Sequence, residues 1–282
     1  YNVWIRDLAS GEERALTCDG AADFFYATDR FPFPVVQAVW SPDSQQLFTH
    51  QLDRRQVAST PLVRHVPPEG SLRPQLTQWT CSLPGDKQVE TYRLLAINVN
   101  SGQSQAAQYM PLPLSRGGPG YFSAEKMGWW GSDSQRAFFV DVERGTQTVR
   151  VVEFNTLSGD TRILFEEIAS SFVKHHIPVE KHPVILPLTA SDELVWLSER
   201  DGYAHLYLYD LKIGQLKHPI TEGSWYVHAV LHIDTTRREL LVQTTHRNPD
   251  SPFYCDLCWV NIDTGILTPL LSDSFEYTVY NS

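Results

Sequence analysis

The sequence predicts an all-β protein assembled from a repeated unit of about 50 residues. Short apolar stretches of strand length dominate the chain, and a polar turn that ends in glycine recurs along it. No stretch has the length and the caps of a convincing amphipathic helix. The best helical candidate, residues 165–172, is short and has no capping residue.

The clearest strand signal lies in residues 193–211. Apolar residues alternate with other residues on both sides of Arg200, Asp201 and Gly202. An Asp-Gly dipeptide between two alternating apolar runs is a strong signal for a β-hairpin. We therefore expect two strands joined by a tight turn, and we interpret the charges of Glu199, Arg200 and Asp201 as turn chemistry.

A glycine closes a polar turn after an apolar strand five times along the chain. The intervals between successive closing glycines are 91, 57, 55 and 51 residues. A period of about 50 residues with four short strands in each unit is typical of the blades of a β-propeller. An insertion at residues 61–84, rich in Pro, Gly, Ser and Thr, explains the long first interval and is predicted to be a loop. The closing glycines are Gly11, Gly102, Gly159, Gly214 and Gly265.

The repeat divides the single propeller domain, residues 1–282, into whole and partial blades. Because an open propeller leaves sheet edges and faces uncovered, we expect this set of blades to be part of a larger propeller. The whole four-stranded antiparallel blades are predicted at about 34–111, 122–168, 180–223 and 227–273, and half-blades at 1–17 and 274–282.

Composition excludes several classes of partner. The 282 residues are 42% hydrophobic and 12% aromatic, which is ample for a core, and the net charge is −10. An acidic surface without a Lys/Arg cluster disfavours nucleic acid. No apolar run approaches the roughly 18–20 residues of a membrane helix. The chain begins at Tyr1 without an initiator Met, so we expect it to be a piece of a longer protein.

The search for metal or redox chemistry gives two weak candidates, so no metal or cofactor is predicted. Cys255 and Cys258 stand three apart in an expected strand, where they point to opposite faces and cannot readily hold one ion together. His175, His176 and His182 have only Glu180 as a nearby carboxylate and are interpreted as a polar connection between blades. All four cysteines, Cys18, Cys81, Cys255 and Cys258, are interpreted as structural.

No catalytic residue is predicted in this chain. It has no Gly-x-Ser-x-Gly nucleophile elbow, no glycine-rich phosphate loop and no His-Glu-x-x-His pattern. Glu166 and Glu167 form an acidic pair, but in the last strand of a blade they are expected to face solvent. His205 and Tyr207 are expected to pack within their blade. These residues favour a scaffold or a binding module.

Residues 198–207 read Ser-Glu-Arg-Asp-Gly-Tyr-Ala-His-Leu-Tyr. This string resembles a signature of the propeller domain of dipeptidyl peptidase IV-like serine peptidases, within the prolyl oligopeptidase family. Residues 39–43, 141–146 and 221–227 are similar to further strings of that family, and they follow in the family's order.

The resemblance implies an N-terminal propeller that caps a separate α/β-hydrolase domain carrying Ser, Asp and His. The propeller would then restrict access and orient peptides, and this chain alone would hydrolyse nothing. The implied partners are a peptide substrate, the hydrolase domain of the same polypeptide and a second copy in a homodimer. The resemblance also favours a bacterial periplasmic or secreted protein.

One departure from the family concerns substrate binding. Dipeptidyl peptidases carry a motif like Asp-Trp-x-x-Glu-Glu, whose carboxylates bind the free amino terminus of the substrate. The corresponding segment, residues 27–36, is shorter and holds one acid beside a base, Asp29 and Arg30. These two are the candidate substrate-binding residues, and dipeptidyl specificity does not follow from the resemblance.

Two other functions fit the sequence less well. A propeller that stands alone and binds peptides or proteins is the main alternative. An unrelated enzyme on a propeller scaffold, such as a glycosidase, is disfavoured because no convergent set of carboxylates is visible.

Overall fold

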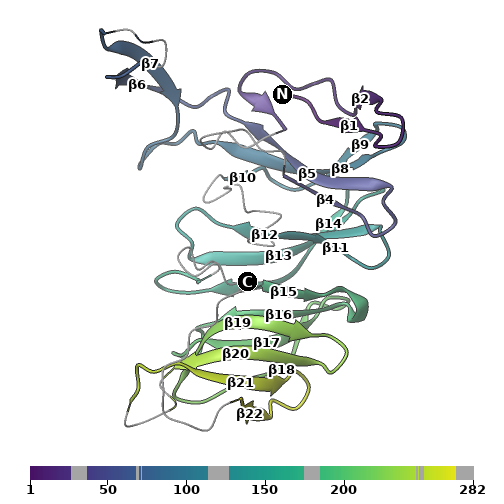
Figure 1. The fold of residues 1–282 in the computed structure, drawn as a ribbon, viewed down its shortest axis with the longest axis vertical. Helices are drawn as coiled ribbons and strands as arrows, with labels where there is room; N and C mark the ends of the chain where they lie inside the picture. The colour runs from purple at the N-terminus through teal and green to yellow at the C-terminus, as the bar shows by residue number, and fades with distance from the viewer. Residues whose placement is uncertain are drawn as a thin grey trace.

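The computed structural model describes residues 1–26, 37–67, 70, 72–113, 127–174, 185–245, 247 and 251–270. Four antiparallel sheets follow one another in chain order along its longest axis (Figure 1). Apart from one 3-10 turn, η1 (Thr189–Ser191), the described elements are strands. The all-β prediction is confirmed, and these sheets have the form of propeller blades.

Each blade is numbered by its place in the chain, and its strands pair in the order given. Blade 1 comprises β4 (Ala38–Trp40), β5 (Gln46–Asp53), β8 (Thr91–Asn98) and β9 (Ser104–Ala106). Blade 2 comprises β11 (Gly128–Trp130), β12 (Arg136–Val142), β13 (Thr148–Asn155) and β14 (Thr161–Ile168). Blade 3 comprises β15 (Ile185–Leu188), β16 (Glu193–Ser198), β17 (His205–Asp210) and β18 (Gln215–Pro219). Blade 4 comprises β19 (Tyr226–Asp234), β20 (Glu239–Thr245), β21 (Asp256–Asn261) and β22 (Leu267–Pro269).

Short strands add to the first part of the chain. β1 (Trp4–Arg6) and β2 (Glu13–Ala15) form a two-stranded sheet beside blade 1. β3 (Phe24–Phe25) pairs with the end of β5, on the same edge of β5 as β4, and β10 (Leu112–Pro113) pairs with the start of β8.

The prediction of a loop at residues 61–84 is wrong. β6 (Ser59–Arg64) pairs with β7 (Gln75–Thr80) in an antiparallel hairpin that projects away from the blades (Figure 1). Pro61 lies within β6 opposite Gln78, and Leu62, Val63 and Trp79 supply strand-forming side chains. The segment 165–172 likewise continues strand β14 as far as Ile168.

Each inner blade is buried on both of its faces, because blades stack on one another. In β8, Leu94 and Ala96 belong to a core shared with blade 2, whereas Leu95 and Ile97 pack towards β1 and β2. A strand covered on both faces reads as a continuous apolar run instead of an alternating one. Between blades 2 and 3 the rings of Phe165 and Tyr209 stack with centroids 3.8 Å apart.

The five closing turns share one hydrogen-bond pattern. An Asp or Asn side chain accepts from the backbone N–H groups two and three residues later, and its own carbonyl accepts from the N–H of the closing glycine. The Asx residues are Asp7, Asn98, Asn155, Asp210 and Asn261.

The closing glycines of blades 1 to 4 also lie close to the backbone of the preceding unit. Gly214 has φ 72°, and a Cβ built on it would lie 2.3 Å from the carbonyl oxygen of Leu164 in blade 2. Gly102 has nearly the same φ, 73°, and a Cβ built on it would lie 3.1 Å from the carbonyl oxygen of Leu16. The repeat therefore selects glycine both for a left-handed backbone and for close packing between blades.

Candidate functional site

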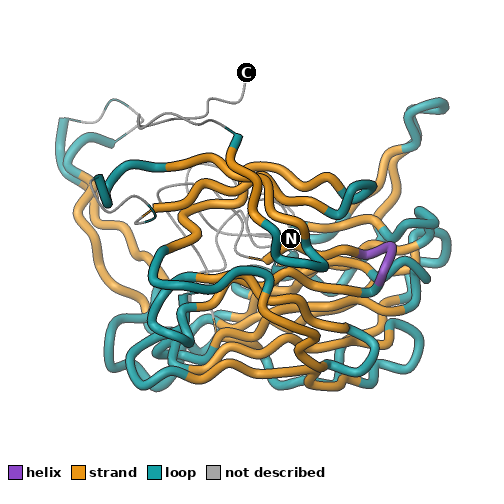
Figure 2. The backbone as a smooth tube through the Cα atoms, turned by 90° about the horizontal axis from the view of Figure 1, so that it is seen from below, coloured by secondary structure: helices purple, strands orange, loops and turns teal. Residues whose placement is uncertain are grey.

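The two ends of the blades carry connections of different kinds. One end, the turn face, holds the tight connections between first and second strands and between third and fourth strands. The other end, the loop face, holds the connections between second and third strands and the links from blade to blade. Figure 2 shows strands crossing the molecule and connections gathered at its ends, with η1 on the turn face. Because long loops on a rigid scaffold commonly carry function, the loop face is the candidate functional surface.

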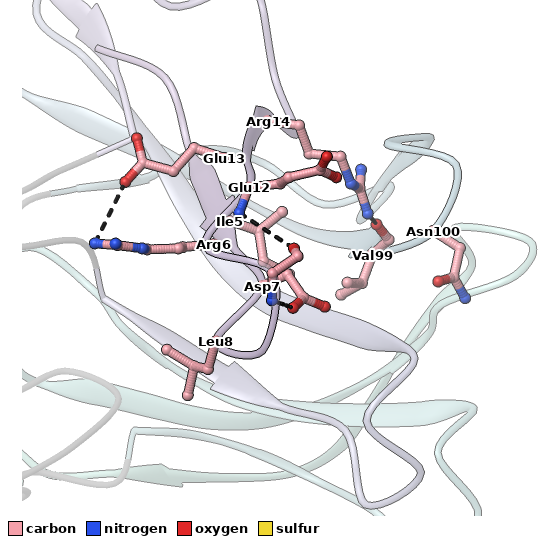
Figure 3. A pocket seen from close by; sticks show the side chains of 10 residues that line it. Ile5, Arg6, Asp7, Leu8, Glu12, Glu13, Arg14, Val99 and Asn100 are labelled. Carbon is pink, nitrogen blue, oxygen red and sulfur yellow. Dashed lines mark hydrogen bonds and ion pairs between the residues drawn. The ribbon is translucent and has the colours of Figure 1, made fainter.

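The turn face has a hollow of about 830 Å³, but its charged side chains do not form a candidate site. Arg6 points towards Glu13 across 3.9 Å, and Arg14 donates to the carbonyl of Val99 (Figure 3). The Asp7 carboxylate is occupied by the closing turn, and these backbone hydrogen bonds, from Ser10 foremost, lower its pKa. Arg6, Asp7, Glu13 and Arg14 are thus paired or used locally, and their contacts do not converge on one point.

A cluster of polar residues around Arg93 lies at the loop-face end of blade 1. Gln51 and Arg93 face each other across β5 and β8, and the Arg93 Nε donates to the Gln51 Oε1 at 2.9 Å. The Gln51 amide donates to Asp19 (3.2 Å), and the Tyr26 hydroxyl donates to the same carboxylate (2.8 Å). Burial together with this hydrogen bond raises the pKa of Tyr26. The Arg93 cluster, with Phe24 below the guanidinium at 5.7 Å, thus joins four chain segments.

Two neighbouring arginines are neutralised by their own carboxylates. Arg54 lies 2.6 Å from Asp23, and Arg55 forms a bidentate pair with Asp53 at 2.9 and 2.6 Å. The hydrogen bond from Arg55 holds the pKa of Asp53 below its ordinary value. Of these three arginines, Arg93 has the longest distance to a carboxylate: its Nη2 lies 3.7 Å from Asp19.

A second cluster on the loop face joins blades 2 and 3 through Glu167. Its carboxylate accepts hydrogen bonds from Trp196 Nε1 (2.8 Å), Ser198 Oγ (2.6 Å) and Arg200 Nη2 (2.7 Å). The Arg200 guanidinium lies 4.4 Å from the ring centroid of Tyr207. The Glu167 side chain is only 10% exposed, so the prediction that it faces solvent is wrong. Arg200, interpreted as turn chemistry, connects two blades.

His205 and Thr221 form a hydroxyl–imidazole contact of 3.0 Å, but both are buried. The imidazole Nε2 lies 2.9 Å from the carbonyl of Gly223, which can only accept, so Nε2 carries the proton. The Thr221 hydroxyl then donates to Nδ1 and accepts from the N–H of Leu206. This arrangement ties the end of β18 to β17, and the expectation that His205 and Tyr207 pack within their blade is confirmed by their burial.

Several predicted residues fall outside the described part of the chain. Asp29 and Arg30 belong to residues 27–36, which follow directly on Tyr26 of the Arg93 cluster. His175, His176, Glu180 and His182 lie in residues 175–184. Glu166 is described; it is half-exposed and pairs with Arg150 at 3.2 Å.

The cysteines and the described histidines form no recognisable metal site. Among the described residues, no group of three His, Cys, Asp or Glu side chains could hold a metal ion. The four cysteines form no disulfide; Cys258 is buried in β21 with Arg247 Nη1 2.7 Å from its sulfur. In the part of the chain that the structure describes, no helix is long and apolar enough to span a membrane.

Sequence reasoning missed both clusters of the loop face. A signal for the first was present in β5, where Thr49, His50 and Gln51 interrupt an apolar strand, because buried polar residues require partners. The partners Asp19 and Arg93 lie far away in the sequence, and the register that joins them is a property of the folded sheet.

The whole chain, residues 1–282, matches the family model described as the dipeptidyl peptidase IV N-terminal region. A probable dipeptidyl peptidase 4 of Emericella nidulans is 24% identical over 98% of this chain and 36% of its own length. The chain therefore spans about a third of that curated relative.

Solved structures give the same fold. Dipeptidyl peptidase 4 of Porphyromonas gingivalis superposes with a TM-score of 0.74 and 19% identity, over 96% of this chain and 36% of the other. A putative dipeptidyl aminopeptidase IV of Bacteroides ovatus gives a TM-score of 0.66 and 18% identity, over 94% of this chain and 39% of the other.

Proposed function

Because the chain belongs to the dipeptidyl peptidase IV N-terminal family, we propose that it is the non-catalytic propeller domain of a serine peptidase. In this proposal the propeller gates access and orients peptides for a separate Ser-Asp-His hydrolase domain of the same polypeptide. The observation that carries it is the family match over the whole chain. The loop face supports it, since its polar clusters hold charged side chains in fixed positions without a catalytic constellation among the described residues.

Asp29 and Arg30 are the proposed contacts to the amino end of the peptide. One carboxylate beside a guanidinium binds an ammonium group less strongly than two carboxylates do, because the base repels it. We therefore expect the parent protein to discriminate less strictly against blocked amino termini than a peptidase with an acidic pair.

The test is hydrolysis by the full-length protein of peptides with Pro or Ala in second position, with free or acetylated amino termini. Asp29→Asn is expected to raise KM for the free form about tenfold, as loss of a charged hydrogen bond does, and to leave the acetylated form unchanged. A reading frame that ends near Ser282 without a Gly-x-Ser-x-Gly domain, or a full-length protein that cleaves neither peptide, contradicts the peptidase proposal.

A second copy of the protein is the proposed partner of the β6–β7 hairpin. An isolated two-stranded hairpin is at best marginally stable in water. Its apolar side chains are exposed, among them Leu76 (74%) and Trp79 (55%). Association of two such hairpins would cover these side chains and the unpaired strand edges.

Trp79→Asp is expected to convert a dimer into a monomer in sedimentation-velocity measurements at micromolar concentration. Ile213→Asp, at an equally exposed apolar position on the turn face (60%), is the control and should leave the dimer intact. A wild-type protein that is monomeric, or a Trp79→Asp variant that stays dimeric, argues against this interface.

A further inference from the structure

Arg93 has hydrogen-bonding capacity that the described residues do not use. Its side chain is 44% exposed; its Nε donates to Gln51, and the guanidinium also hydrogen-bonds the Tyr26 hydroxyl. A guanidinium carries five N–H groups in a fixed fork. The Asp19 carboxylate, 49% exposed, lies 3.7 Å from Nη2, a distance at which the two charges attract without sharing a hydrogen bond.

Hydrogen bonds from buried residues hold Arg93 and Asp19 in place. Gln51 is completely buried, and it uses its amide oxygen to hold Arg93 and its amide nitrogen to hold Asp19. Tyr26, also buried, donates to the other oxygen of Asp19. Neither Gln51 nor Tyr26 can turn away without losing a buried hydrogen bond, so the orientation of the pair is preorganised.

The pair has the chemistry that a peptide backbone needs. A half-exposed guanidinium presents donors, and a half-exposed carboxylate beside it presents acceptors. In an extended chain the N–H and C=O of one residue point to the same side, as in a strand ladder. The partly buried Phe24 ring, 5.7 Å from the guanidinium carbon, adds an apolar surface for a side chain.

We propose that Asp19 and Arg93 form a peptide subsite that binds the backbone of one residue of an extended substrate, Arg93 donating to its C=O and Asp19 accepting from its N–H. The proposal rests on the proposed peptidase function and adds the place where the substrate chain is held. The site lies at the loop-face end of blade 1, directly before residues 27–36. Because the pair is neutral as a whole, it suits a neutral backbone better than a charged group.

The experiment compares a ten-residue peptide with a short dipeptidyl p-nitroanilide in the full-length protein. Arg93→Gln and Asp19→Asn are each expected to raise KM for the long peptide about tenfold, with kcat and the kinetics of the short substrate unchanged. Arg162→Gln, at a similarly exposed arginine (49%) on the turn face, is the control and should change neither substrate.

Replacing single amides of the long peptide by esters locates the bound residue. In the wild type, one ester is expected to raise KM as much as Asp19→Asn does, and the same ester should cost less in that variant, because the uncharged amide oxygen there is a weaker acceptor than the carboxylate. Unchanged KM in Arg93→Gln and Asp19→Asn, or losses shared equally by the short substrate, overturn the subsite. Failure of the wild type on both substrates instead overturns the peptidase function.

Discussion

Glu167→Ala is expected to destabilise the protein by about 3–5 kcal/mol, because it leaves two buried donors, on Trp196 and Ser198, unsatisfied at about 1–3 kcal/mol each. The change leaves Trp196 Nε1, Ser198 Oγ and the Arg200 guanidinium without their shared acceptor. Trp196 is 1% exposed, so water cannot replace the lost hydrogen bond to its indole without opening the contact between blades 2 and 3. Two blades are then affected by one substitution.

Thermal unfolding of the full-length protein measures the effect, which should lower Tm by about 10 °C. Glu166→Ala is the matched control, since Glu166 is the preceding residue of the same strand and its side chain, paired with Arg150, is half-exposed. Such a pair contributes at most about 1 kcal/mol. Equal shifts in the two variants would show that Glu167 does not link the blades, and an unfolding temperature unchanged in Glu167→Ala would show the same.

Features whose partners lie close together in the sequence could be predicted, and those whose partners lie in different blades could not. The closing turns were predicted correctly because their signal is local: an Asx residue stands four places before a glycine, and both partners lie within one turn. The hairpin at residues 193–211 is likewise local, although residues 199–204 form a longer connection than the predicted tight turn. Neither prediction needs knowledge of which blades are neighbours.

The loop-face clusters depend on that knowledge. Glu167 meets Arg200 from the next blade, and Asp19 meets Arg93 through a residue buried in a third segment. Composition misled the interpretation of residues 61–84, because Pro61 and the other Pro and Gly residues of this segment outweighed the strand-forming side chains, and neither β6 nor β7 has an alternating burial pattern. The two clusters and the β6–β7 hairpin depend on strand register and on contacts between segments, and a single sequence contains no direct signal for either.

Gly214→Ala is expected to cost about 3 kcal/mol or more, because two penalties act at one position. A left-handed backbone at φ 72° costs a residue with a Cβ about 1 kcal/mol. The new Cβ would also lie 2.3 Å from the Leu164 oxygen and 2.9 Å from its Cα and carbonyl carbon, all of them backbone atoms of blade 2. Backbone of a buried, hydrogen-bonded strand cannot move aside as a flexible side chain would, so blades 2 and 3 must separate.

Gly102→Ala separates the two penalties, since its turn has the same hydrogen bonds and φ is 73°. Its Cβ would lie 3.1 Å from the Leu16 oxygen, a contact relieved by a shift of a few tenths of an ångström. We therefore expect a loss of about 1 kcal/mol there, and a Tm at least about 4 °C higher than that of Gly214→Ala. If both variants lose the same stability, the left-handed backbone of the turn alone explains why glycine stands at these positions. If Gly214→Ala loses more, the repeated glycine sets the spacing of the blades, and with it the position of the Glu167–Arg200 contact on the opposite face.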